Sequence, residues 1–339
     1  MKVSVLIIGG AGYIGSHVVR LLQQNGFKTV VYDNLSTGHR ELVEGDFIFG
    51  DILDKGKLSA VFEEYDFDII IHLAAKSIIS ESMQKPLMYY ENNLSGTVNI
   101  LKLMREYGVK RIIFSSTASV YGNPRKIPIT ENDEPKPDSV YGFSKLAIER
   151  MIADVSSVDG FSYVILRYFN AAGADFSGTI GELHIPETHL IPRVLDVAIG
   201  DSPYIEVFGT DYDTPDGTCI RDYVHVLDVA EIHMLALEWL LSDVEGGQIF
   251  NVGSGHGFSV LDIIEIARKI TGKDIPIKES QRREGDPPKL VASPEKLKRF
   301  FGWEPKYSDP ETIIRTAWEW HKGKRLEIVK KRKLIGEPL

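Results

Sequence analysis

The feature that most constrains this chain is a glycine-rich turn that directly follows its first apolar run. Residues 3–8 are mostly apolar, and Gly9-Gly10-Ala11-Gly12-Tyr13-Ile14-Gly15 comes next. Glycines at every third position, between a strand and a helix, allow a tight turn, close backbone approach to a pyrophosphate and close helix packing. The positive end of the helix then lies at the phosphates. The residues expected to bind a dinucleotide here are Gly9, Gly12, Tyr13, Ile14 and Gly15.

Short apolar runs alternate with helical patterns through the first half of the chain, which favours a parallel sheet with helices on both faces. The sequence therefore predicts an α/β fold with a doubly wound, Rossmann-type sheet. Strands are predicted at residues 3–8, 29–32, 46–49, 69–72, 111–115 and 163–167, and helices are predicted to start near Tyr13, Lys55, Tyr89 and Tyr141.

The pattern changes after Asn170, where loops rich in glycine, proline, threonine and aspartate dominate. An amphipathic helix at residues 228–241 and a strand at 249–252 then return to the earlier pattern. We therefore predict a discontinuous division of the chain. Residues 1–169 plus about 221–252 form the dinucleotide-binding domain, and residues 170–220 plus 253–339 form a smaller α+β substrate lobe.

The second predicted strand ends at Asp33, the position where dinucleotide-binding folds carry an acid. A carboxylate there accepts hydrogen bonds from a ribose 2′-hydroxyl and repels a 2′-phosphate, which favours NAD over NADP. A turn or N-cap aspartate is the alternative. Asn93 has a comparable alternative as a buried structural amide. The other expected cofactor contacts up to the fifth strand are Asn34, Asp51, Ile52, Leu73, Ala74, Ala75 and Asn93.

Tyr141 and Lys145 are four residues apart, so they share one face of the predicted helix. A nearby ammonium group favours phenolate and lowers the pKa of a tyrosine, which is about 10 in a free side chain. The pair can therefore act as a base. Taken alone, this spacing is also common in ordinary amphipathic helices.

Composition limits the partners and the compartment. A net charge of -9 over 339 residues disfavours general nucleic-acid binding, so an anionic ligand would need locally placed arginines. The single cysteine, Cys219, excludes an intrachain disulfide and is compatible with a reducing compartment. No apolar span approaches ~20 residues. We expect a cytoplasmic protein without nucleic-acid or membrane partners, and without a metal site, because the histidines outside the motifs lack ligand spacing.

Several motifs together resemble the extended short-chain dehydrogenase/reductase superfamily. They are the glycine turn, the Ser-Ser-Thr-Ala-Ser-Val-Tyr-Gly run at 115–122, and Tyr141-x-x-x-Lys145. Further segments are similar to the UDP-glucose 4-epimerase family within it, and the similarity extends along nearly the whole chain. These segments are residues 32–38, 167–173, 188–192, 217–225 and 282–287.

The resemblance implies a reaction in which NAD takes a hydride from C4 of a UDP-hexose and returns it to the other face of a 4-keto sugar. Tyr141 would be the base, Lys145 would lower its pKa and hold the nicotinamide ribose, and Thr117 would hydrogen-bond the reacting oxygen. Ser115, Phe169 and Tyr141 itself complete the implied cofactor contacts. The related 4,6-dehydratases carry an Asp-Glu pair directly after the threonine, whereas this chain has Ala118 and Ser119. Elimination therefore lacks its acid and base.

On the substrate side, the resemblance implies that Arg221 and Arg283 meet the diphosphate of a UDP-sugar. Asp286 would bind the uridine ribose, and the backbone between Tyr204 and Val207 the uracil. The remaining implied substrate contacts are Asn170, His189 and Leu190. Relatives commonly form homodimers through two helices of each subunit, here those at 89–107 and 141–155.

Three questions about specificity stay open in the sequence. Leu290 occupies a position where, in this family, a bulky tyrosine excludes N-acetylated sugars, so UDP-N-acetylglucosamine is a possible substrate. Epimerisation or decarboxylation of a UDP-glucuronate is an alternative activity. A dinucleotide-sensing scaffold without catalysis is a more distant alternative, which the presence of Thr117, Tyr141 and Lys145 argues against.

Overall fold

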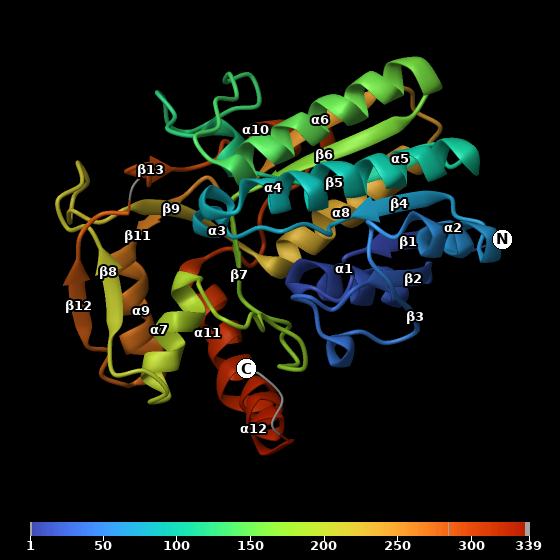
Figure 1. The fold of residues 1–339 in the computed structure, drawn as a ribbon. Coiled ribbons are helices and arrows are strands. Elements are labelled where there is room, and N and C mark those ends of the chain that lie inside the picture. The colour runs from blue at the N-terminus through green and yellow to red at the C-terminus, as the bar shows by residue number, and fades with distance from the viewer. Residues whose placement is uncertain (1, 284, 336–339) are drawn as a thin grey trace.

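A computed structural model describes residues 2–283 and 285–335 of the chain, so residues 336–339 of the predicted substrate lobe lie outside it. Its centre is a seven-stranded sheet in which all neighbouring strands are parallel, in the order β10-β6-β5-β4-β1-β2-β3 (Figure 1). This confirms the predicted doubly wound fold. The strands are β1 (Ser4–Ile8), β2 (Lys28–Asp33), β3 (Asp46–Phe49), β4 (Ile69–His72), β5 (Arg111–Thr117), β6 (Ser162–Tyr168) and β10 (Gly247–Val252).

The strands are apolar on both faces because helices cover both faces. Along β1, Val5 and Ile7 point into one core cluster, and Leu6 and Ile8 point into the other, as the two-residue period of a strand requires. Figure 1 shows helices on both sides of the sheet. The first cluster is closed by α1 (Tyr13–Gln24) and α8 (Val226–Leu241), and the second by α2 (Lys55–Glu64), α5 (Gly96–Glu106) and α6 (Val140–Asp159).

The strand order reverses between β1 and β4, which both end at the same edge of the sheet. The backbone N–H groups of Leu73 and Ala74 both donate to the carbonyl oxygen of Ile8, at 2.8 and 3.0 Å. In open parallel sheets, ligands bind outside the carboxyl ends of the strands at such a reversal. The glycine turn therefore lies where a dinucleotide is expected.

The C-terminal part of the chain adds two small sheets and a separate core. Strand β9 pairs with β7, β11 and β13. The pairing of β7 with β9 is parallel, and a sequence pattern does not reveal it. The elements are β7 (Asn170–Ala172), β8 (Ile205–Phe208), β9 (Ile220–His225), β11 (Gly257–Ser259), β12 (Ile277–Ser280), β13 (Lys289–Leu290), α7 (Leu190–Ala198), α9 (Val260–Thr271) and α11 (Pro310–Trp320).

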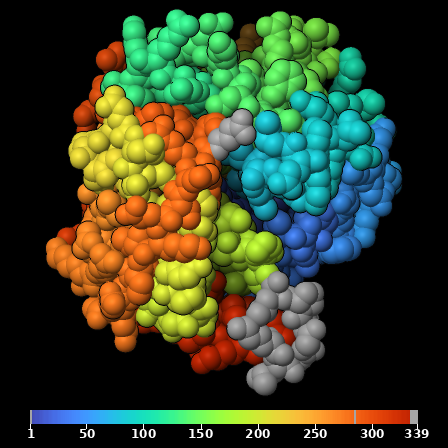
Figure 2. Space-filling model, turned by 60° about the vertical axis from the view of Figure 1, so that its left-hand side comes forward, coloured from blue at the N-terminus to red at the C-terminus, as the bar shows by residue number. Residues whose placement is uncertain are grey.

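Shorter helices complete the structure. In Figure 2, the surface is hollowed between the blue and cyan N-terminal segments and the yellow and orange segments. None of the helices within residues 2–283 and 285–335 has the length and apolar character needed to cross a membrane. The short helices are α3 (Ile79–Gln84), α4 (Pro86–Tyr89), η2 (Tyr90–Ser95), η1 (Arg40–Leu42), η3 (Ala118–Tyr121), α10 (Glu295–Phe301), η4 (His321–Arg325) and α12 (Leu326–Ile335).

Candidate active site

The glycine turn is shaped by backbone contacts that leave no room for side chains. Gly9 has a φ of +85°, and a Cβ atom there would lie 2.5 Å from the backbone nitrogen of Ala74. A Cβ atom on Gly15 would lie 2.4 Å from the carbonyl oxygen of Gly9. Gly12 is the N-cap of α1 and supplies no side chain to the first turn. The first N–H groups of α1 are therefore available to an anion, as a diphosphate requires.

Asp33 ties the end of β2 to this turn. Its Oδ2 accepts a hydrogen bond from the N–H of Ala11 at 3.0 Å, and its Oδ1 accepts one from Leu35 at 2.8 Å. Burial raises the pKa of Asp33, and the two backbone hydrogen bonds oppose that rise. Because a carboxylate has about four acceptor positions, two stay available for ribose hydroxyls. Nearby, Asn34 donates to Oδ2 of Asp51 at 2.7 Å, which orients the side chains of these two predicted cofactor contacts.

Asn93 is buried and has an architectural role. Its Oδ1 accepts from the N–H of Lys76 at 2.9 Å, and its Nδ2 donates to the carbonyl oxygen of Lys76 and to Oγ of Ser144, both at 3.1 Å. The amide thus joins the segment after β4 to α6. Its predicted contact with a cofactor stays a prediction.

The three predicted catalytic residues lie together. Helix α6 begins at Val140, capped by Ser139, whose Oγ accepts from the N–H of Gly142 at 3.1 Å. Lys145 is almost fully buried, and its Nζ donates to the carbonyl oxygen of Ser115 at 2.7 Å while lying 6.0 Å from the ring centroid of Tyr141. The side chain of Thr117 lies near enough to the phenol of Tyr141 to lower its pKa by hydrogen bonding.

Burial dominates the pKa values of Tyr141 and Lys145. In the polypeptide itself, burial raises the pKa of Tyr141 to about 12, and the hydrogen bond with Thr117 offsets only part of this rise. Burial also lowers the pKa of Lys145 to about 7, against the attraction of Glu149. In the chain alone, desolvation therefore dominates the pKa of both groups. The predicted lowering of the Tyr141 pKa by Lys145 stays a prediction.

A buried ion pair between Arg167 and Glu149, one turn after Lys145 on α6, was not identified from the sequence. Nη2 of Arg167 lies 2.6 Å from Oε2 of Glu149, and both side chains are almost fully buried. Nη1 of Arg167 also donates to the hydroxyl of Tyr121 at 2.7 Å, which in turn donates to Oδ1 of Asn251 at 2.7 Å. Glu149 follows Lys145 by four residues, so the spacing that drew attention to Tyr141 and Lys145 could also have found it.

The predicted diphosphate and ribose contacts come from β9 and the segment before β13. Nη1 of Arg221 donates to the carbonyl oxygen of Pro287 at 2.8 Å, and Nη2 lies 3.7 Å from Oδ1 of Asp286. The guanidinium of Arg283 stacks 3.9 Å above the ring centroid of Phe208. The structure thus brings Arg221 and Asp286 together, while Arg283 lies at the end of β8.

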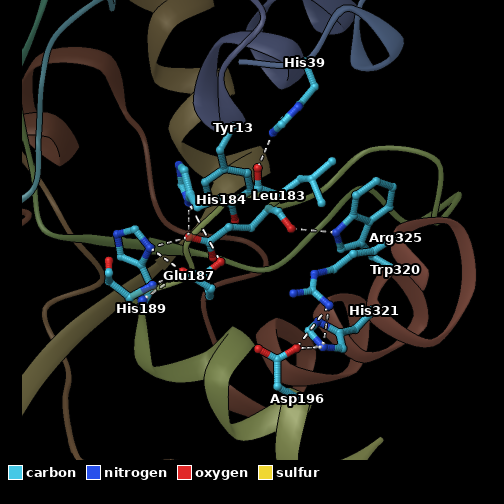
Figure 3. Close-up of polar contacts among 12 residues, drawn as sticks. Tyr13, His39, Leu183, His184, Glu187, His189, Asp196, Trp320, His321 and Arg325 are labelled. Atoms are coloured by element: carbon cyan, nitrogen blue, oxygen red, sulfur yellow. Dashed lines mark hydrogen bonds and ion pairs between the residues drawn. The ribbon is translucent and has the colours of Figure 1, made fainter. Parts of the chain in front are cut away.

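The side chains of two predicted substrate contacts, Val207 and His189, contact other parts of the protein. Val207 is buried in the core of the small lobe, so only its backbone can meet a ligand, as expected. The Nδ1 atom of His189 lies 2.8 Å from Oε1 of Glu182 and 2.9 Å from Oε1 of Glu187. Sequence reasoning missed this cluster, which also contains His184 (Figure 3). The Glu-x-His-x-x-Glu-x-His spacing at 182–189 is the signal that could have found it.

Fold and site together define an extended short-chain dehydrogenase/reductase, with a doubly wound sheet, a glycine turn and a Tyr-x-x-x-Lys pair beside a threonine. The chain belongs to the NAD dependent epimerase/dehydratase family, whose model matches residues 5–253.

Named relatives match nearly the whole chain. It is 51% identical to a UDP-glucose 4-epimerase of Halalkalibacterium halodurans over 94% of this chain and 96% of that one. A UDP-glucose 4-epimerase from Bifidobacterium longum, solved with NAD+ and UDP, matches with a TM-score of 0.90 and 36% identity, over 94% and 98% of the two chains. The UDP-Glc/GlcNAc 4-epimerase from Campylobacter jejuni matches with a TM-score of 0.82 and 41% identity, over 95% and 99%.

The lowered pKa of Lys145 predicts a pH-dependent stability of the chain without added ligand. Between a folded pKa of about 7 and an unfolded pKa of about 10.4, only the unfolded chain binds this proton. The free energy of unfolding should therefore rise with pH in this window, by at most about 1.4 kcal/mol per pH unit. Urea unfolding of wild type and Lys145→Met between these limits measures the difference. The exposed Lys102→Met on α5 should keep the wild-type slope. An equal slope in Lys145→Met would contradict the prediction.

Proposed function

We propose that this chain catalyses the reversible interconversion of UDP-glucose and UDP-galactose through a 4-keto intermediate, with tightly bound NAD. The observation that carries the proposal is the meeting of Thr117, Tyr141 and Lys145 at the ends of β5 and α6. The two positions after Thr117 hold Ala118 and Ser119, so no carboxylate stands there for an elimination. The names of the close relatives favour this activity over the glucuronate alternatives.

The residues at the glycine turn fit NAD. The uncapped start of α1 and the buried carboxylate of Asp33 match a diphosphate and a ribose diol. When bound, NAD supplies the hydride acceptor and donor for C4 and a positive ring charge that lowers the pKa of a nearby phenol. We assign this function to residues 1–169 plus about 221–252, and UDP-sugar binding to residues 170–220 plus 253–339.

The residues of this chain would divide the proton chemistry among them. Tyr141 removes the proton of the sugar 4-hydroxyl and later returns it, so it must serve both as base and as acid. Thr117 holds the same oxygen by a hydrogen bond. Lys145 supports the phenolate and keeps α6 against β5 through the carbonyl oxygen of Ser115. On the other side, Arg221 and Arg283 would neutralise the diphosphate.

Removal of the phenol tests this proposal. Tyr141→Phe should reduce kcat by about 10²–10⁴-fold, because general acid–base catalysis is lost, while the NAD content of the purified protein stays unchanged. UDP-galactose conversion without added cofactor gives the rate, and NAD released by denaturation gives the content. Tyr65→Phe, a variant of a tyrosine that stacks on Phe67, should keep full activity. Full turnover by Tyr141→Phe would contradict the proposal and favour a dinucleotide-sensing scaffold. If wild type needed a stoichiometric supply of cofactor, the protein would instead be a dehydrogenase.

We infer that N-acetylated UDP-hexoses are also substrates. Leu290 packs on the hydrophobic cluster that contains Ala118 and Phe169. Because Ala118 directly follows Thr117 in the sequence, the side chain of Leu290 lies near the proposed catalytic residues. Leucine is smaller than the tyrosine that restricts this position in the family. The similarity to the Campylobacter jejuni enzyme, which is named for both UDP-Glc and GlcNAc, supports the inference.

Enlarging this side chain tests the inference. Leu290→Tyr should reduce kcat/KM for UDP-N-acetylglucosamine by about tenfold or more, a steric cost of at least ~1.4 kcal/mol, and should leave UDP-glucose conversion nearly unchanged. Leu290→Ala is the matched control and should accept both sugars. The inference fails if wild type does not convert UDP-N-acetylglucosamine under conditions where UDP-glucose turns over.

We also propose a homodimer built on the face that carries α4, α5 and α6. Leu87 on α4 is 80% exposed, and Met83 and Phe143 on the neighbouring α3 and α6 are more than half exposed. Exposed apolar side chains on adjoining helices mark an interaction surface. Leu87→Glu should shift the mass measured by light scattering from dimer toward monomer, and a wild-type monomer at every protein concentration would refute the assignment.

A cytoplasmic location is part of the proposal. Cys219 is the only cysteine of the chain and is buried as a free thiol, which a reducing compartment permits. Recovery of the native protein in the periplasmic or secreted fraction of its host would contradict this location.

A further inference from the structure

We propose that Glu182, His184, Glu187 and His189 form a structural binding site for a divalent metal ion of the zinc type. The four residues lie in the loop before α7, and each offers one ligand atom within 4.8 Å of the others. Figure 3 shows the two imidazoles turned toward the carboxylate of Glu187. The proposal concerns a site separate from the epimerase chemistry.

The separations between ligand atoms suit a tetrahedral ion. Bonds of about 2.0–2.2 Å to nitrogen and oxygen place tetrahedral ligand atoms about 3.3–3.6 Å apart. In the structure, Nδ1 of His184 lies 3.0 Å from Oε1 of Glu182 and 4.0 Å from Oε2 of Glu187. Nδ1 of His189 lies 2.8 and 2.9 Å from the same two carboxylates. These distances lie on both sides of the tetrahedral value. Small side-chain rotations would therefore bring the four ligand atoms to tetrahedral separations.

One ligand atom lacks a hydrogen-bond partner. The side chain of Glu187 is only 6% exposed. Its Oε2 atom is buried and accepts no hydrogen bond. Its other oxygen accepts from the N–H groups of Thr188 and His189, both at 2.8 Å, which fixes the direction of the carboxylate. A buried carboxylate oxygen without a partner is costly, and a metal ion beside His184 would satisfy it.

Charge balance points the same way. The side chains of Glu182 and Glu187 are 8% and 6% exposed, and no lysine or arginine among residues 2–283 and 285–335 forms an ion pair with either of them. Among the described residues, only the imidazoles of His184 and His189 form ion pairs with these carboxylates, and an imidazole carries a charge only when it is protonated. One divalent ion with two neutral imidazoles gives a neutral site, in which the ion is the dominant local charge.

The backbone of the loop is held from outside, so the ligands are preorganised. The carbonyl oxygen of Leu183 accepts from Nε2 of His39 at 2.5 Å, and that of Glu182 accepts from Nε1 of Trp320 at 2.9 Å. The ring of Tyr13, the first residue of α1, meets that of His184 edge to face, at 6.4 Å between centroids. The imidazole of His189 is 54% exposed and gives an ion access.

The ligand set indicates the kind of ion and its role. Two imidazoles and two carboxylates suit zinc and similar divalent transition metals better than calcium or magnesium, which favour oxygen ligands. Four protein ligands leave no open position, as in structural zinc sites. His189 is also the N-cap residue of α7. The ion would therefore fix the loop between α1, α7 and α11.

Metal content measured on the full-length protein tests the site. Dialysis of wild type against Zn²⁺ and then metal-free buffer should leave about one tightly bound ion per chain, and a strong chelator should remove it and lower the thermal midpoint. Glu187→Gln and His184→Ala should retain close to none. His256→Ala, which removes an exposed histidine outside the cluster, should match wild type.

Substitution with Co²⁺ provides a readout of geometry. The strong visible absorption of tetrahedral cobalt in wild type, absent from Glu187→Gln, would support the site. Equal metal content in wild type and both variants, or a weak octahedral cobalt spectrum, would indicate adventitious binding and overturn the proposal. Absence of retained zinc in wild type would overturn it as well, without reliance on the folding of any variant. None of these measurements depends on epimerase activity.

Discussion

The docking of α6 on β5 and β6 is the interaction on which the proposed active site depends. Tyr141, Lys145 and Glu149 occupy one stripe of this helix, one turn apart. Lys145 donates to the backbone of Ser115, and Glu149 accepts from Ser116 and pairs with Arg167. Because such a buried pair costs about 3–5 kcal/mol when one partner is removed, the helix has little freedom to shift. The phenol of Tyr141 is therefore positioned by contacts one and two turns away from it.

The burial that gives this rigidity also determines the electrostatics. Desolvation raises the pKa of Tyr141 to about 12 and lowers that of Lys145 to about 7. The polypeptide alone thus favours a neutral phenol and weakens the charge of its neighbour. The base that we propose at Tyr141 would therefore need a positive charge brought to it by a ligand, which would link its protonation state to the occupancy of the dinucleotide site.

The loop at 182–189 connects the two parts of the protein. Its backbone is held by His39 on the side of the dinucleotide-binding sheet and by Trp320 of α11 in the small lobe. Tyr13, at the start of α1, also donates to the carbonyl oxygen of Gly173 at 2.6 Å. Helix α1, which follows the glycine turn, is therefore anchored to the segments that lead into the substrate lobe.

Local pattern was sufficient to predict the strands of the main sheet, the glycine turn, Asp33 at the end of β2 and the shared face of Tyr141 and Lys145. These features depend on residue periodicity and on steric limits near one point of the chain. The tertiary structure alone decided that β9 joins the small sheet, that Glu149 meets Arg167 from β6, and that Glu182 meets His189 in a loop braced by Trp320. The tertiary structure also buries Tyr141, which raises its pKa in the chain alone. Those outcomes depend on burial and on the strands and loops packed around each residue, which the spacing of residues along the chain does not contain.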